Sequence, residues 1–415
     1  MRWLPLLCLL ASLMPCGAKA DPAEDVAGRA CSALTARVAA VAGDDPLFLR
    51  SYDAGSGDGP NPVPALNAAF TYDNALAVIA LRACGQLDAA RRIGDALLAA
   101  SEADRGGEAG RLRNAYRPGA VHETPVPPMG WWNADAQHWD EDPYQVGSAT
   151  GNLAWAALAL LTLAEATRDS EYTDGAVRIA RWAAKASADA RAPGGFTGGL
   201  YGYDDQAQPL GWKSTEHNVD LAAVFDWLAR LQPAAGWQAP ARQARDFVAA
   251  LWDPARGRFW VGTLPDGVSI NRANSGLDAE LWPLLLAETP PEWQRALAYV
   301  EQSHAARPGF DFNDDRDGVW WEGTAQAALV YRLLGREAEA DRLLKAVARR
   351  FSQGGLLWAT DAARITTGLA LSPGSTTDDF YYFRLPHLGA TAWAALAARA
   401  WNPFTGRQFG ARSVP

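Results

Sequence analysis

Four carboxylates stand where apolar, helix-forming segments begin, and their side chains are the ones best suited to acid and base chemistry. They are Asp73, Glu216, Asp278 and Glu322. Glu216 also shares a helical face with Asp220, and like charges at this spacing destabilise a helix by roughly a few tenths of a kcal/mol. The alternative role for each carboxylate is to complement the helix dipole and to bind free backbone N–H groups at the helix start.

A dense polar cluster surrounds Glu216 on a helix that we expect to be internal. Thr215, His217, Asn218 and Asp220 are polar where packing would favour apolar groups. Such a cluster is typical of a functional site, so we predict Glu216 as a proton donor and His217, Asn218 and Asp220 as ligand contacts. For His217, three roles remain open: orienting a carboxylate, binding a hydroxyl, or making a structural hydrogen bond.

Three residues are candidates for the second carboxylate of an acid–base pair: Asp278, Asp73 and Glu322, each in the first turn of another expected inner helix. Cleavage of a glycosidic bond requires such a pair, in which one carboxylic acid protonates the leaving oxygen and one carboxylate acts as base or nucleophile. Tyr72, directly before Asp73, is predicted to contact the same ligand.

Tryptophan is unusually frequent, with 18 residues in a chain of 415. Indole rings stack on the apolar C–H faces of sugars, while Asp and Asn bind sugar hydroxyls. Packing within a loop is the alternative for any single ring. Six tryptophans in or beside the loops before expected inner helices are predicted to bind substrate: Trp131, Trp132, Trp139, Trp212, Trp320 and Trp321.

The elements that must position these residues are helices, with few strands. Segments apolar on all sides, such as Leu153–Leu161, alternate with segments that keep one charged face, such as 337–351. Short connections make neighbouring helices antiparallel. About twelve helices are predicted, at 25–42, 71–83, 87–101, 150–168, 173–187, 216–231, 238–251, 276–287, 291–304, 321–334, 337–351 and 388–401.

Six antiparallel pairs predict an all-α fold, an (α/α)6 barrel of two concentric rings, in which residues 21–415 form one domain. The helix from 25 would complete the outer ring beside the inner helix at 388. Uneven spacing of the inner helices argues against a solenoid. Because the inner helices run parallel, the long loops before them, of which 102–149 is the largest, should meet at one end and form a functional face.

The chain resembles the six-hairpin glycosidase superfamily, the (α/α)6 toroids that include many glycoside hydrolases and some polysaccharide lyases. The resemblance rests on the helix count and on four inner-helix starts that cover about 70–401: Phe70-Thr71-Tyr72-Asp73-Asn74, Ser214-Thr215-Glu216-His217-Asn218-Val219-Asp220, Asn274-Ser275-Gly276-Leu277-Asp278 and Trp320-Trp321-Glu322-Gly323-Thr324. It implies a cleft at the loop-rich end and a carbohydrate substrate.

Three functions follow from this resemblance and stay open. The first, which we predict, is a glycoside hydrolase acting on a polysaccharide or oligosaccharide, and the other two are alternatives. The second is a polysaccharide lyase, in which Tyr72 or His217 would remove a proton and Arg or Asn would neutralise a uronate. The third is a non-catalytic sugar-binding or export-accessory protein. A net charge of -9 disfavours nucleic acid as a partner and weakly disfavours a polyanionic substrate.

Residues 1–20 are predicted to be a secretory signal, with Arg2, a short apolar run and Ala18-Lys19-Ala20. A lipoprotein anchor at Cys16 is less favoured, because Pro15 precedes it. We therefore expect a periplasmic or secreted protein without a membrane span. Cys31 and Cys84 would remain after removal of the signal, either as a disulfide or as two buried thiols.

An acidic segment partly matches a calcium-binding loop. Asn313, Asp315 and Asp317 alternate and Gly318 follows, but Thr324 stands where the loop pattern requires a bidentate glutamate. A solvated acidic turn is the favoured interpretation, and no metal is predicted as a catalytic cofactor.

Overall fold

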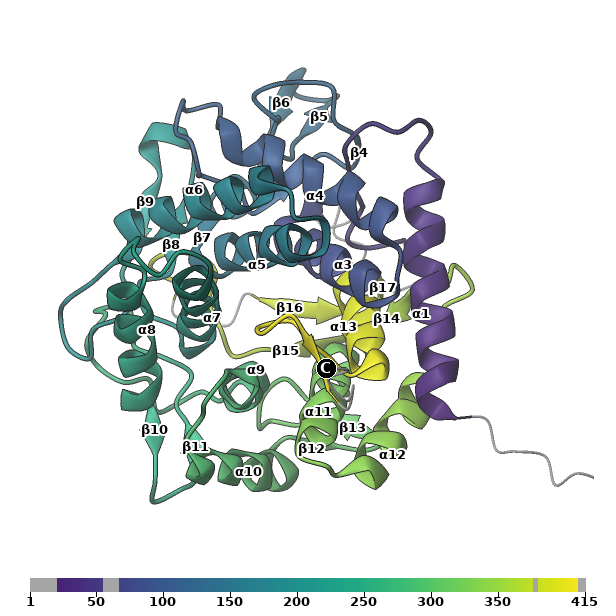
Figure 1. Ribbon diagram of the computed structural model, residues 1–415, viewed down its shortest axis with the longest axis vertical. Coiled ribbons are helices and arrows are strands. Elements are labelled where there is room, and N and C mark those ends of the chain that lie inside the picture. The colour runs from purple at the N-terminus through teal and green to yellow at the C-terminus, as the bar shows by residue number, and fades with distance from the viewer. Residues whose placement is uncertain (1–20, 55–66, 376–379, 410–415) are drawn as a thin grey trace, which may run out of the picture.

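The computed structural model describes residues 21–54, 67–375 and 380–409. Within these ranges, twelve α-helices form six antiparallel hairpins that close into a double ring (Figure 1). The inner helices are α3 (Thr71–Ala83), α5 (Thr150–Thr167), α7 (Thr215–Leu231), α9 (Leu277–Leu281), α11 (Trp321–Leu333) and α13 (Leu388–Arg399). The outer helices are α4 (Leu87–Glu102), α6 (Ser170–Ser187), α8 (Gln238–Ala250), α10 (Arg295–Ser303), α12 (Glu337–Val347) and α1 (Pro22–Ala39). The predicted (α/α)6 barrel is confirmed.

The two rings differ in burial as their sequences predict. Every residue of α5 from Leu153 to Ala164 is buried, because the helix is surrounded by protein. In α12 only Ala340, Leu343, Leu344 and Val347 are buried, and they form one stripe. Each inner helix contacts the next one around the ring, and α13 contacts α3 to close it.

Helix α1 completes the outer ring by packing on α13 (purple and yellow in Figure 1). Asp21 caps it, since its Oδ1 accepts a hydrogen bond of 2.9 Å from the backbone N–H of Ala23. A disulfide joins Cys31 of α1 to Cys84 at the end of α3. Of the two states left open by the sequence, the structure therefore has the disulfide.

Several helices are shorter than their sequences predict, among them α10, which begins at Arg295 although a helix is expected over 291–304. The segment expected to be helical over 276–287 forms α9 for five residues and continues as a 3₁₀ helix, η2 (Trp282–Leu285). Pro283 explains the change, because proline has no N–H to donate and its ring clashes with the preceding turn. The helix expected over 337–351 ends at Val347, and two further 3₁₀ turns occur at η1 (Asp204–Gln206) and η3 (Pro291–Gln294).

The expectation of few strands was wrong for the loops, which contain short antiparallel ladders. Two or three residues cannot show the alternation that identifies a strand in sequence. The ladders pair β1 (Leu47–Phe48) with β4 (Gly119–Ala120), β2 (Ala69–Phe70) with β3 (Ala115–Tyr116), β5 (Trp131–Asn133) with β6 (His138–Asp140), β7 (Ser148–Ala149) with β8 (Gly199–Tyr201) and β9 (Gln208–Leu210), β10 (Trp252–Asp253) with β11 (Arg258–Phe259), β12 (Ala305–Ala306) with β13 (Gly309–Phe310), β14 (Leu357–Trp358) with β17 (Pro386–His387), β15 (Arg364–Thr366) with β16 (Tyr381–Phe383), and β18 (Trp401–Asn402) with β19 (Arg407–Gln408).

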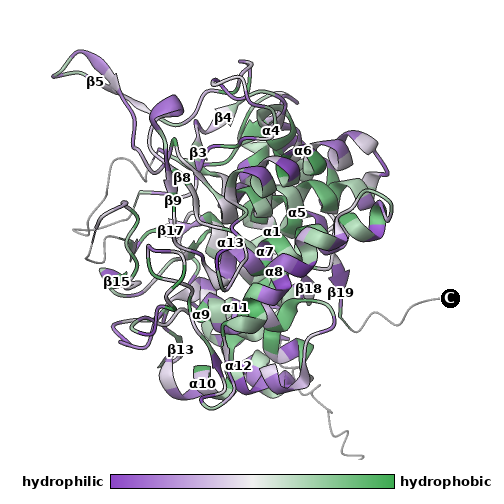
Figure 2. Cartoon of the chain, turned by 90° about the vertical axis from the view of Figure 1, so that its left-hand side faces the viewer, coloured by the Kyte–Doolittle hydropathy of each residue, from purple (hydrophilic) through white to green (hydrophobic). Residues whose placement is uncertain are grey.

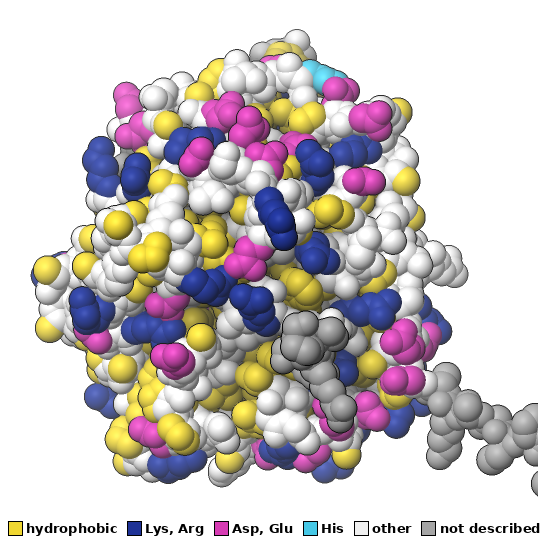
Figure 3. Space-filling view, viewed as in Figure 1, with side chains coloured by type: hydrophobic (Ala, Val, Ile, Leu, Met, Phe, Trp, Pro, Cys, Tyr) yellow, Lys and Arg dark blue, Asp and Glu magenta, His cyan; other side chains and the backbone are white. Residues whose placement is uncertain are grey.

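The long loops form a layer on one side of the ring. In Figure 2 the helices lie to the right and the loops with β3, β8, β9 and β15 lie to the left. On the face shown in Figure 3, acidic and basic side chains are interspersed. No helix in the described ranges is long and apolar enough to cross a membrane. The predicted signal segment, with Cys8 and Cys16, lies outside the described residues.

Candidate active site

A cavity of about 770 Å³ opens among the loops at the N-terminal ends of the inner helices. Five of the six inner-helix starts contribute to its wall, because every inner helix points the same end toward the loop layer. The wall residues from these starts include Tyr72, Asp73, Gly151, Asn152, Trp155, Glu216, His217, Gly276, Asp278 and His387.

The four predicted carboxylates come together at this end of the ring. Asp73, Glu216 and Asp278 line the cavity. Glu322 is 1% exposed and lies behind the wall, where its Oε1 accepts a hydrogen bond of 2.6 Å from the Tyr72 hydroxyl. The charge of Glu322 acts on both Glu216 and Asp278, so these groups form one electrostatic cluster.

Burial raises the pKa of Glu216, Asp278 and Glu322. Burial, then the charge of Glu322, raises the pKa of Glu216 to about 7. Burial and the charges of Glu216 and Glu322 raise the pKa of Asp278 well above its usual range. Burial also raises the pKa of Glu322 to about 7, although the charge of His387 opposes the shift. Raised pKa values of this kind let a carboxyl group hold a proton at neutral pH, as a general acid must.

His387 links two of the carboxylates. Its Nε2 lies 3.2 Å from Asp73 Oδ1 and its Nδ1 lies 3.3 Å from Glu322 Oε2, while Tyr52 stacks on the ring with the centroids 4.3 Å apart. Burial alone would lower the pKa of His387, but the charge and hydrogen bond of Asp73, with the charge of Glu322, raise it.

The His387 cluster depends on a glycine in the first turn of α13. A Cβ on Gly389 would lie 2.4 Å from Asp73 Oδ1 and 3.2 Å from Glu322 Oε2, so a side chain there would displace a carboxylate. The indole of Trp393, one turn further along α13, donates a hydrogen bond of 2.9 Å to the Tyr72 hydroxyl. Helix α13 thus fixes Tyr72, Asp73 and Glu322 from a single face.

Comparison with known proteins identifies the fold. No family model matches the sequence, and neither does any curated protein. A solved glycosidase, a glutamate-to-alanine variant in complex with glucose, matches with a TM-score of 0.60 and 13% identity over 92% of this chain and 99% of that one. A GH76 α-mannanase from Bacteroides thetaiotaomicron matches with a TM-score of 0.54 and 12% identity over 91% and 98%. An α-amylase from Clostridium perfringens matches with a TM-score of 0.56 and 9% identity over 89% and 97%.

The chain has the six-hairpin glycosidase fold. At these identities the likeness establishes the fold alone, and the roles of individual residues are argued from their positions.

Within the six-hairpin ring, the polar residues predicted around Glu216 separate into cavity and core positions. His217 lines the cavity beside Trp212, with ring centroids 5.3 Å apart, and burial lowers its pKa to about 4. Asp220 is fully buried one turn deeper. Asn218 is also buried, and its side chain bonds to the backbone of Ser214 and Phe196, which is a structural position.

The six predicted tryptophans occupy three different environments in the six-hairpin fold. Trp212 lines the cavity. Trp320 and Trp321 are fully buried, so they pack in the core and do not reach the cavity. Trp131, Trp132 and Trp139 lie on the β5–β6 hairpin outside the cavity. Tyr72, also predicted as a contact, lines the cavity.

The sequence interpretation did not single out His387, Tyr52 or Tyr382, which line the cavity. A signal was present for His387, because it directly precedes the last inner helix, the same place that drew attention to Glu216 and Asp278. Tyr52 and Tyr382, the latter in β16, do not precede an inner helix and so lack such a marker, and only the tertiary structure brings them to the site.

Asn313, Asp315 and Asp317, the ligands of the less favoured calcium alternative, do not gather as one set. Asp311, Asp315 and Asp317 gather instead, with one oxygen of each within 4.8 Å of the others, whereas Asn313 accepts a hydrogen bond from the backbone N–H of Asp315. Asp311 accepts from backbone N–H groups, and Thr366 donates to both other carboxylates. The bonds from Thr366 hold the acidic turn against β15, and we assign no metal site to this turn.

Proposed function

We propose that this protein is a glycoside hydrolase in which Glu216 is the general acid and Asp278 is the second carboxylate. The observation that carries the proposal is that both groups face one cavity and neither has an ion-pair partner among the described residues. Burial and the charge of Glu322 raise the pKa of Glu216, and burial with the charges of Glu216 and Glu322 raises the pKa of Asp278. Such a pair retains a proton at neutral pH and keeps one member available as base or nucleophile.

In the proposed reaction, Glu216 transfers its proton to the glycosidic oxygen as the bond to the anomeric carbon breaks. Asp278 acts on the opposite side of the sugar, either as base toward water or as nucleophile, and one water is added overall. Asp73 and Glu322 are positioning residues, since both are held by His387. Burial, with a further contribution from Glu322, raises the pKa of Glu216 and so favours its protonated form.

The residues around the cavity favour a neutral sugar over a uronate. Among the described wall residues, Lys213 is the only Lys or Arg, and its ammonium lies 3.2 Å from Asp189. The one ammonium of the described wall is therefore paired with a carboxylate and is not free to neutralise a uronate. The Tyr72 hydroxyl donates to Glu322, and burial with that charge raises its pKa, so Tyr72 is a poor base for the lyase alternative.

The aromatic lining of the cavity supports a polysaccharide or oligosaccharide as substrate. Trp212, Tyr144 and Tyr382 offer aromatic surface beside the acids, as stacking on sugar rings requires. The solved neighbours named above include enzymes whose names refer to mannan and to amylase activity. We also propose export to the periplasm or exterior, which agrees with a disulfide between Cys31 and Cys84.

The test is release of reducing ends from a panel of neutral and acidic glycans. Glu216→Gln and Asp278→Asn are each expected to lower kcat by about 10²–10⁴. The unmodified protein should release no ultraviolet-absorbing product, which a lyase would form. Glu171→Gln is the matched control, because Glu171 lies in the first turn of an outer helix and is exposed. Equal activity of Glu216→Gln and the control would remove Glu216 from the mechanism. Glycan binding without cleavage of any substrate by the unmodified protein would favour the accessory function instead.

A further inference from the structure

A β-hairpin projects from the loop layer and carries exposed aromatic rings. Trp132 of β5 and Trp139 of β6 are paired across the hairpin and are 56% and 42% exposed. In Figure 2 this hairpin extends outward at the upper left, on the side of the loops. Tyr203, on the connection between β8 and β9, is also 42% exposed. Large exposed aromatic side chains commonly mark a binding surface.

A second, shallower pocket of about 460 Å³ lies where these two segments meet. It is lined by Arg105, Trp139, Asp140, Glu141, Tyr203 and Asp204. The same two segments continue into the wall of the main cavity, to which the neighbouring residues Asp142 and Tyr201 contribute. The pocket therefore lies beside the mouth of the candidate active site.

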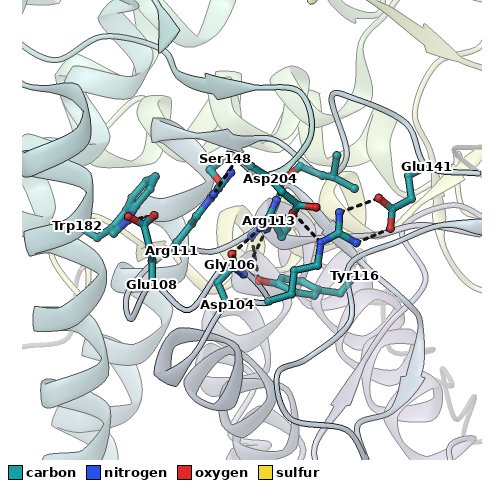
Figure 4. A network of polar contacts seen from close by, with 12 residues as sticks. Asp104, Gly106, Glu108, Arg111, Arg113, Tyr116, Glu141, Ser148, Trp182 and Asp204 are labelled. Atoms are coloured by element: carbon teal, nitrogen blue, oxygen red, sulfur yellow. Dashed lines mark hydrogen bonds and ion pairs between the residues drawn. The ribbon is translucent and has the colours of Figure 1, made fainter. Parts of the chain in front are cut away.

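The polar groups of this pocket are fixed by a charge network. Arg105 donates to both carboxylate oxygens of Glu141, at 2.6 and 2.7 Å, and to Asp204 at 2.7 Å. Asp204 also lies 3.0 Å from Arg113, whose guanidinium is buried against Asp104 (Figure 4). These bonds hold the polar groups of the pocket in fixed positions, and carboxylates outnumber cations in its lining, which disfavours an anionic ligand.

The aromatic residues are held as well. The Arg117 guanidinium lies 4.6 Å from the centroid of the Trp139 ring, and the Tyr203 hydroxyl donates to the backbone carbonyl of Glu141 at 3.0 Å. Preorganised aromatic and polar groups lose little conformational freedom when a ligand binds. Aromatic faces suit the C–H faces of a pyranose, and paired carboxylates suit its hydroxyls.

We infer that the pocket formed by Trp139, Tyr203 and the Arg105 network is a distal binding site for a neutral polysaccharide chain, a second part of which occupies the main cavity. The inference rests on the proposed function. The substrate must then be long enough to reach from Glu216 and Asp278 to the β5–β6 hairpin. We therefore expect the protein to prefer polymers over short oligosaccharides.

The test compares long and short substrates in Trp139→Ala, Trp139→Phe and a control. Soluble starch and yeast mannan are the long probes, and maltotriose and mannotriose are the short ones. Trp139→Ala is expected to lower kcat/KM at least fivefold on the polymer that is cleaved and to leave kcat/KM on the trisaccharide unchanged. On the polymer, Trp139→Phe should have a kcat/KM between those of the wild type and Trp139→Ala. Leu231→Ala, an exposed apolar side chain at the end of α7, should change neither. Equal effects on long and short substrates would overturn the inference.

Affinity electrophoresis separates this inference from the proposed function. The Glu216→Gln protein should be retarded by gels that contain the polymer, and adding Trp139→Ala should remove most of the retardation. If the unmodified protein cleaves no glycan but its retardation depends on Trp139, the proposed hydrolase function is wrong and the distal binding site is supported. Cleavage of a polymer with retardation unchanged by Trp139→Ala, or no retardation by either polymer, would overturn the distal site.

Discussion

The raised pKa of Glu216 has consequences for stability as well as for chemistry. A glutamate that only caps a helix gains from being ionised in the folded state, whereas a buried acid is stabilising only while it keeps its proton. A helix-capping role and a buried-acid role for Glu216 therefore predict opposite changes in stability when its charge is removed.

Glu216→Gln is expected to raise Tm by roughly a few degrees at pH 8 and to leave it nearly unchanged at pH 4. The carboxyl ionises at about pH 4.3 in an unfolded chain and at about 7 in the folded protein. Its stabilising contribution is complete below the unfolded pKa and is lost as the pH rises through 7. Thermal denaturation at the two pH values measures the effect. A lower Tm at pH 8, as expected for loss of a cap, would contradict it.

The space around Asp73 and Glu322 is predicted to be intolerant of a single methyl group. Gly389→Ala should lower kcat by about 10²-fold, since it displaces a positioned carboxylate by an appreciable fraction of an ångström or more. Gly28→Ala is the control, because a Cβ at Gly28 would meet nothing within 4 Å on an exposed helix face. That change should raise stability by about 0.5–1 kcal/mol and leave activity unchanged. Full activity of Gly389→Ala would show that the cluster does not need its observed geometry.

Residue types alone indicated part of this site. Glu216, Asp73, Asp278 and Glu322 could be chosen because each begins an apolar helix. The partnership of Tyr72 with Glu322 could not, because the two residues are 250 positions apart and their contact exists only after the ring has closed.

At the scale of elements, the disulfide ties the two ends of the ring closure together. It links α1, which covers α13, to the end of α3. Because α13 and α3 are neighbours and also support Asp73 and His387, the link secures the hairpins on which the site depends.

Replacing Cys31 and Cys84 together by serine is expected to lower the free energy of unfolding by about 2–4 kcal/mol. Activity at 25 °C should persist, since Cys84 lies at the end of α3 opposite Asp73. Denaturant unfolding of the double variant, beside the wild type with and without reductant, measures the loss. Equal stability of oxidised and reduced wild type would contradict the prediction.

The sequence predicts where a helix begins or ends when neighbouring residues in the chain decide it. The apolar runs of α5 and α13 identified inner helices, and Pro283 could have predicted the early end of α9. The short ladders of the loop layer could not be predicted in this way, because a pair such as β2–β3 is held by a partner distant in the chain.

At the scale of the whole molecule, each hairpin buries its inner helix against two neighbours, so no hairpin has a core of its own. This differs from a solenoid, in which terminal repeats can separate from the rest. The closed contacts from α3 around to α13 make the ring a single structural unit.

We therefore expect residues 21–415 to unfold in one calorimetric transition, whose midpoint is the same by far-ultraviolet circular dichroism and by tryptophan fluorescence. Deleting α1 should abolish this transition, because Val26, Ala27, Ala30 and Leu34 of that helix are fully buried and their removal would expose the outer side of α13. Two separated transitions in the intact protein would contradict a single domain.

The sequence by itself determined that the chain is a ring of paired helices and which ends of the helices carry acids, because burial on all sides and helix starts leave local patterns. Tertiary structure alone decided which acids are tied to His387, which face a cavity, and which tryptophans are buried or exposed. The physical reason is that pKa, burial and hydrogen bonding depend on neighbours in space, and in a closed ring those neighbours come from both ends of the chain.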